Sequence, residues 1–290
     1  MKFSVSLYSF FSALRAGEIT LLECVDKAKE MGFDAIEAVD FVMGCPPEEM
    51  PEMAKKIKER ADQNGLEISS FAVGADLLNG QDGSGDSQKE IARVKSMVDI
   101  AAILGAPRMR HDITMGQKGS PKSYAALVPQ LAELVREIAD YAQSKGILTM
   151  TENHGFFSQD SERVELLYNT VNHPNFALLC DIGNFTCADE NPATAVARVA
   201  PYVKYVHAKD FIIKSYYDND PGEGAFQTRA GNYLRGTIIG HGNVPVKQCL
   251  HILKKAGYDD TIAIEFEGME PALTAIRVGL ANLKKYWAEA

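Results

Sequence analysis

Four apolar stretches in the second half of the chain each stop at a side chain that can bind a metal ion. The stretch at 147–150 leads to Glu152, and three later stretches lead to Asp181, His207 and Glu265. Short apolar runs bounded by polar residues are typical of buried β-strands. Three carboxylates and one imidazole form a hard, oxygen-rich ligand set that suits Mn²⁺ or Mg²⁺, with Co²⁺ or Zn²⁺ as alternatives. The sequence therefore predicts one divalent metal site built from four strand ends.

The charge of these side chains also indicates a cation. Alternate residues of a strand face the same side of a sheet, so each ligand shares a face with the apolar residue two places before it. Carboxylates that point into one small volume raise each other's pKa unless a cation offsets their charge. Any one of them alone is more often a polar strand end or a helix cap, and only their recurrence favours a site. Glu267 has the same parity as Glu265, but we favour Glu265 because the apolar run ends there.

The elements that position these residues follow a repeating unit of helix, glycine, apolar strand and polar strand end. We expect strands at 2–10, 35–39, 66–73, 107–113, 147–152, 177–181, 203–207 and 261–265. We expect helices that end at Gly32 and Gly257, further helices at 51–64, 87–104, 123–145, 161–171 and 192–199, and a last one from 271. Glycine commonly ends a helix, and it recurs between helix and strand along the whole chain.

Eight apolar strands with helices between them indicate an α/β fold with a parallel sheet. No G-x-G-x-x-G follows any strand, which disfavours a dinucleotide-binding sheet. We therefore predict a single (β/α)8 TIM barrel domain over residues 1–290, with an inserted loop at 209–243 after strand 7. The four ligands then come from consecutive strands, whose C-terminal ends carry the active site in this fold.

Several short motifs extend this pattern along the chain. They are Glu152-Asn153-His154, Asp181-Ile182-Gly183-Asn184, His207-Ala208-Lys209-Asp210, Gly240-His241-Gly242-Asn243 and Ile264-Glu265-Phe266-Glu267, with the opening strand through Tyr8 and the strand Ala35-Ile36-Glu37. In this order they resemble the xylose-isomerase-like sugar phosphate isomerase/epimerase family, which includes ketose 3-epimerases, hydroxypyruvate isomerase and inosose dehydratase. The resemblance implies one divalent ion held by Glu152, Asp181, His207 and Glu265, with Glu152 and Glu265 as the catalytic acid/base pair.

The expected chemistry is proton transfer next to the carbonyl of a sugar or sugar phosphate. A metal that chelates the carbonyl and a neighbouring hydroxyl stabilises the enediolate, while Glu152 and Glu265 remove and return the proton. Epimerisation and isomerisation both fit, and a dehydratase of a keto-sugar or inosose is the alternative on the same site. An endonuclease IV-like hydrolase is disfavoured, because Asn184 stands where such relatives have a histidine.

Other polar residues are predicted to contact the substrate. They are His154, Lys209, Asn184, Glu37, His111, Tyr8, Arg229 and Arg235. Structural alternatives remain open for several: capping for His154, a core position for His111, and packing in the barrel floor for Tyr8. Arg229 and Arg235 belong to the 209–243 insertion, which would hold a substrate phosphate as a lid or would face a partner.

The composition limits the other classes. A net charge of −9 and a pI near 5.3 argue against nucleic acid as a partner, and no apolar run is long enough to span a membrane. Serines interrupt the first fourteen residues, which favours a strand over a secretion signal. Five cysteines without C-x-x-C spacing predict reduced, buried thiols in a cytoplasmic protein. A homo-oligomer remains possible.

Overall fold

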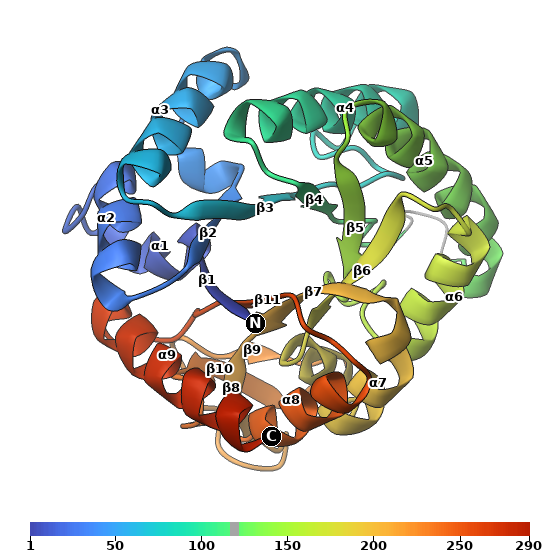
Figure 1. The fold of residues 1–290 in the computed structure, drawn as a ribbon. Helices are drawn as coiled ribbons and strands as arrows, with labels where there is room; N and C mark the ends of the chain where they lie inside the picture. Colours follow the sequence, from blue (N-terminus) through green and yellow to red (C-terminus); the bar gives the residue numbers. More distant parts are fainter. Residues whose placement is uncertain (117–121) are drawn as a thin grey trace.

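The computed structural model, which describes residues 1–116 and 122–290, contains a closed barrel of parallel strands (Figure 1). The strands are β1 (Lys2–Ser6), β2 (Ala35–Val39), β3 (Glu67–Val73), β4 (Arg108–His111), β5 (Leu148–Glu152), β6 (Phe176–Asp181), β7 (Val203–Ala208) and β11 (Thr261–Ile264). They pair in the order β1-β11-β7-β6-β5-β4-β3-β2, and β11 closes the barrel by pairing with both β7 and β1. The predicted (β/α)8 barrel is confirmed.

Helices surround this barrel on the outside (Figure 1). They are α1 (Phe11–Arg15), α2 (Leu21–Met31), α3 (Met50–Gln63), α4 (Ser87–Leu104), α5 (Tyr124–Ser144), α6 (Ser161–Val171), α7 (Pro192–Val199), α8 (Val246–Lys255) and α9 (Ala272–Glu289). None of the helices in the described part of the chain has the length and apolarity needed to cross a membrane. The first strand is shorter than predicted, because Leu7–Phe10 form a 3₁₀ helix that leads into α1.

The apolar core has an outer and an inner part. The outer part lies between the sheet and the helices. The inner part consists of Met150, Ala177, Leu179, Tyr205 and Ala263. Four of these five residues lie two positions before a predicted metal ligand, and alternate residues of a strand share a face. The four ligands therefore point into the barrel, directly above its inner core.

The insertion predicted as a loop at 209–243 instead contains a small antiparallel sheet. Its strands are β8 (Asp210–Lys214), β9 (Phe226–Gln227) and β10 (Tyr233–Thr237), in the order β8-β10-β9. The turn between β9 and β10 is tied to the barrel, because the Asp189 carboxylate accepts hydrogen bonds from Thr228 Oγ1 at 2.6 Å and Asn232 Nδ2 at 2.9 Å. The strands are short and separated by polar residues, so the sequence carried only a weak signal for them.

Asp210 fixes the point at which the chain leaves the barrel after β7. Its carboxylate accepts hydrogen bonds from the backbone N–H groups of Phe211, Gly240, Gly242 and Val244. A Cβ atom at Gly242 would lie 2.2 Å from Asp210 Oδ1, so only glycine permits this close approach. One buried carboxylate thus joins the start of β8 to the segment before α8.

Asp210→Asn is expected to destabilise the protein by about 2–3 kcal/mol, because an amide replaces one acceptor oxygen with a donor that faces backbone N–H groups. The matched control is Asp62→Asn on α3, which removes only an exposed ion pair with Lys58 and is expected to cost about 0.5 kcal/mol or less. Guanidinium unfolding of both variants measures the difference, and equal midpoints would contradict this role of Asp210.

Candidate metal centre

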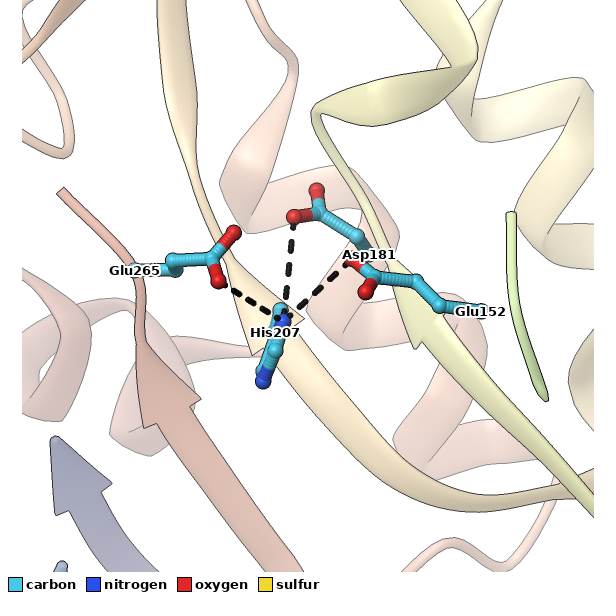
Figure 2. Close-up of side chains that lie close together, drawn as sticks. All are labelled: Glu152, Asp181, His207 and Glu265. Atoms are coloured by element: carbon cyan, nitrogen blue, oxygen red, sulfur yellow. Dashed lines mark ion pairs between the residues drawn. The ribbon is translucent and has the colours of Figure 1, made fainter. Parts of the chain in front are cut away.

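The ends of four neighbouring strands bring Glu152, Asp181, His207 and Glu265 together (Figure 2). One possible ligand atom from each lies within 4.8 Å of the others. His207 Nδ1 is 3.4 Å from Glu152 Oε1, 3.7 Å from Glu265 Oε1 and 4.0 Å from Asp181 Oδ2. Figure 2 shows Glu265 on one side of the imidazole and Glu152 on the other. The convergence that the sequence predicted is therefore present.

The surroundings of His207 fit a divalent cation. Its Nδ1 atom is buried and makes no hydrogen bond, although three carboxylates face it. Its other nitrogen, Nε2, lies 2.8 Å from Glu37 Oε1. Carboxylates commonly hold the second nitrogen of a metal-binding histidine and so orient the ring. Burial alone would lower the pKa of His207, but Glu37 and the facing carboxylates raise it well above its usual value, so an incoming cation would displace a proton.

The backbone around Asp181 orients its carboxylate. The Asn153 side chain bridges β5 and β6, donating to Asp181 O and accepting from Asp181 N, both at 2.9 Å. Asp181 Oδ1 accepts from the N–H groups of Gly183 at 2.8 Å and Asn184 at 2.9 Å. Only Oδ2 is left to face the other ligands. Burial and the charges of Glu152 and Glu265 raise the pKa of Asp181 to about 6.

Lys209 is the cation closest to the ligands on the β11 side. Its Nζ atom is 2.5 Å from Glu265 Oε2 and 3.2 Å from Asp181 Oδ2, and it donates to Asn184 Oδ1 at 3.2 Å. Burial alone would lower the pKa of Lys209, but Asp181 and Glu265 raise it well above its usual value. The side chain therefore carries its charge and offsets part of the charge of the ligand cluster.

Arg110 pairs with Glu152 in the way that Lys209 pairs with Glu265. Its guanidinium pairs with Glu152 Oε2 and with Asp112 Oδ1, the latter at 3.0 Å. Burial would raise the pKa of Glu152, but Arg110 and His207 outweigh this effect and hold it well below its usual value. Asn184 Nδ2 donates to Glu152 Oε1 at 3.0 Å. Arg110 and Asp112 were not predicted as site residues. The one signal in the sequence was a charged residue, Arg110, in the second half of a predicted buried strand.

A cavity of about 250 Å³ opens above the cluster. It is lined by Tyr8, Val39, Asp40, Phe41, Ala72, Gly74, Arg110, Asp112, His154, Lys209, Glu265 and Glu267. Among the predicted substrate contacts, Tyr8, His154 and Lys209 are in this lining, and Asn184 lies beneath it through its bonds to Glu152 and Lys209. His154 Nδ1 is 2.8 Å from Asp112 Oδ1, which orients the imidazole. Burial and the neighbouring Glu267 raise the pKa of Tyr8 to about 12, so its hydroxyl stays protonated.

The remaining predicted contacts do not reach the cavity. His111 is fully buried, and its Nδ1 atom lies 2.9 Å from Asp112 O. This placement agrees with the structural alternative given for His111, a position in the core. Glu37 lies behind His207 instead of facing a substrate. Arg229 Nη1 pairs with Asp160 Oδ2 at 2.8 Å and so fastens the insertion to the loop before α6. Arg235, on β10, lines a separate cavity. Neither arginine is placed to hold a phosphate in the cavity, because the small sheet directs both elsewhere.

The closed parallel barrel and the four converging side chains define the class of protein, a TIM barrel with a candidate metal centre. Sequence comparison identifies the family. The profile of the family described as "Xylose isomerase-like TIM barrel" matches residues 25–286, and the chain belongs to this family. An uncharacterized protein of Methanocaldococcus jannaschii is 26% identical, with 99% of this chain and 89% of that protein aligned. An inosose dehydratase of Clostridium botulinum is also 26% identical, over 47% of this chain and 46% of the relative.

Solved structures share the fold at lower identity. A probable 3-DHS dehydratase, AsbF of Bacillus anthracis, has a TM-score of 0.76 at 19% identity, covering 98% of this chain and 99% of its own. The IOLI protein, described with a bound zinc atom, has a TM-score of 0.76 at 17% identity. The alignment covers 100% of this chain and 99% of the IOLI chain. D-psicose 3-epimerase of Clostridium cellulolyticum, solved with D-tagatose, has a TM-score of 0.71 at 14% identity, covering 99% of both chains. At these identities the likeness concerns the fold.

Addition of Mn²⁺ is expected to raise the melting temperature, because the ion binds the folded ligand cluster and not the unfolded chain. At about 100 times the dissociation constant the gain is about 2.7 kcal/mol, or roughly 5 °C for a chain of this size. Thermal unfolding with and without Mn²⁺ measures it, and Asp181→Asn should remove most of the shift. An equal shift in that variant would place the ion elsewhere.

Glu37→Gln is expected to weaken Mn²⁺ binding by about tenfold, the lower end of the effect seen when a carboxylate behind a metal-binding histidine is lost. Glutamine keeps the volume and an acceptor oxygen but loses the charge that opposes His207. Calorimetric titration with Mn²⁺ measures the affinity, and exposed Glu59→Gln on α3 is the matched control. Unchanged affinity in Glu37→Gln would exclude an orienting role for Glu37.

Proposed function

We propose that this chain is a divalent-metal-dependent isomerase or epimerase that moves a proton next to the carbonyl of a sugar-like ketone. The observation that carries the proposal is the placement of Glu152 and Glu265 on opposite sides of His207, at the floor of one cavity. Two carboxylates arranged in this way can remove a proton from one face of a carbon and return it to the other. The substrate is a small molecule. The net charge of −9 argues against a nucleic acid as a partner.

The proposed metal ligands are Glu152, Asp181, His207 and Glu265, with Mn²⁺ or Mg²⁺ preferred. When bound there, the ion supplies Lewis-acid polarisation of the substrate carbonyl. The neighbouring polar groups position these side chains, so the site is organised before a substrate enters. The structures described with zinc and with D-tagatose support this assignment by analogy of fold.

The two catalytic carboxylates differ in their access to the cavity. Glu265 lines it, and its Oε2 atom is held by Lys209, so Oε1 is the atom directed at His207 and at a bound substrate. The Glu152 side chain is only 1% exposed and is held by Arg110 and Asn184. Both groups are ionised near neutral pH, since neighbouring cations lower both pKa values despite burial. We assign proton removal to Glu265 as the carboxylate. Proton return is assigned to Glu152, which first takes up a proton from solvent because its resting form is ionised.

A dehydratase is the alternative on the same residues. His154 lines the cavity and is held by Asp112, a placement that suits a proton donor to a departing hydroxyl. The names of the inosose dehydratase relative and of the probable 3-DHS dehydratase support this alternative. Reaction of candidate ketones in D₂O separates the two reactions. Deuterium uptake with the hydroxyl retained indicates epimerisation or isomerisation, whereas loss of water indicates dehydration.

Glu152→Gln and Glu265→Gln are each expected to lower deuterium exchange into the substrate by about 10²–10⁴-fold, the usual contribution of a positioned acid or base. The amide keeps a carbonyl oxygen as a ligand, so metal content measured in parallel separates loss of the base from loss of the ion. Exposed Glu59→Gln is the control for the change in charge. Full exchange activity in a metal-loaded Glu265→Gln protein would exclude Glu265 as the base.

A further inference from the structure

Carboxylates outnumber cations around the cavity. The lining contains four carboxylates but only one arginine and one lysine. The carboxylates are Asp40, Asp112, Glu265 and Glu267, and the cations are Arg110 and Lys209. Glu152 and Asp181 lie directly beneath, and their two charges equal those of one divalent ion. The carboxylates of the described lining therefore still outnumber its arginine and lysine side chains when such an ion is bound.

Both cations of the lining are already paired. Arg110 is 8% exposed and contacts Glu152 and Asp112. Lys209 is 4% exposed, and its Nζ atom contacts Asp181 and Glu265 and lies 3.7 Å from Glu267 Oε2. Proteins that recognise phosphate or carboxylate groups usually present arginine or lysine donors to them. Among the described residues that line this cavity, no arginine or lysine is left to do so.

Glu267 separates the cavity from the next cationic side chain. Tyr8 and Glu267 belong to the lining of this cavity and also to that of an adjoining one of about 220 Å³, which contains Arg15. An anionic group that extended from the site toward Arg15 would pass the Glu267 carboxylate. The charge of Glu267 thus opposes anions at the wall that leads toward Arg15.

Two aromatic side chains form a further part of the cavity lining. Tyr8 and Phe41 line it with ring centroids 5.7 Å apart, and Phe41 is 55% exposed, which is high for a phenylalanine. The C–H face of a polyhydroxylated ring or chain is apolar and can pack on such an aromatic surface. Its hydroxyl groups are donors, which carboxylates accept. The volume of about 250 Å³ is below the range of drug-sized pockets and suits a single monosaccharide or cyclitol.

We propose that the substrate is an uncharged polyhydroxylated ketone, and that Glu267 determines this specificity by repelling phosphorylated or carboxylated analogues. The inference rests on the proposed function for the identity of the reaction, but the charge preference can be measured by binding alone. Carboxylates that accept hydrogen bonds from hydroxyl groups favour the neutral ligand, and the same carboxylates oppose a phosphate.

The test compares D-fructose and D-tagatose with their 6-phosphates on the Mg²⁺-loaded protein, by calorimetric binding and by deuterium exchange. The neutral sugars are expected to bind on the order of tenfold more tightly than the phosphates. Glu267→Gln is expected to reduce this ratio by on the order of tenfold. Exposed Glu133→Gln on α5, which makes the same change in net charge, should leave the ratio unaltered.

Tighter binding of the phosphates by the wild-type protein would overturn the inference, as would an unaltered ratio in Glu267→Gln. If the neutral sugars bind preferentially but no ketone, including an inosose, exchanges a proton, the proposed function fails while the charge preference stands. If a phosphate exchanges its proton faster than its neutral counterpart, the function stands and the inference fails.

Discussion

The confinement of like charges around one imidazole nitrogen is the constraint on which this site depends. Glu152, Asp181 and Glu265 place carboxylate oxygens within 4.8 Å of one another and of His207. Removal of several carboxylates from water is costly unless each is paired. The chain supplies Arg110 on one side and Lys209 on the other, and backbone amides bind one oxygen of Asp181. These groups offset only part of the charge, which is why the cluster suits a divalent ion.

The barrel makes this confinement possible because it orders side chains that are distant in the sequence. Parallel strands end at one face, and the inner core beneath the ligands leaves their side chains no other direction. Asn153 then joins the backbones of β5 and β6, and Asp210 fixes the exit from β7. Each ligand thus comes from a rigid strand end rather than from a free loop. Such support keeps functional side chains at productive distances.

Features that depend on neighbouring residues could be predicted from the sequence, whereas contacts between distant residues could not. The four converging side chains could be predicted because each follows its own apolar run. Helices 161–171 and 192–199 were predicted with their observed bounds. The role of Glu37 depends on its contact with His207, which is 170 positions away, and nothing near Glu37 in the sequence indicates that contact. The pairing of Arg229 with Asp160 is likewise non-local, so its charge alone suggested a phosphate site.

The cavity lining divides between the two halves of the barrel. The ends of β4, β5, β7 and β11 contribute most of the charged groups. The segments after β1 and β2 contribute the aromatic surface of Tyr8 and Phe41 and one carboxylate, Asp40. In the proposed reaction, the charged half would transfer the proton, and the other half would contact the rest of the substrate. Glu267 lies where the halves meet, beyond the end of β11. Loops after strands vary without disturbing the barrel. We therefore expect a change at Phe41 or Glu267 to alter the substrate preference of the proposed enzyme and to leave the cluster of predicted metal ligands intact.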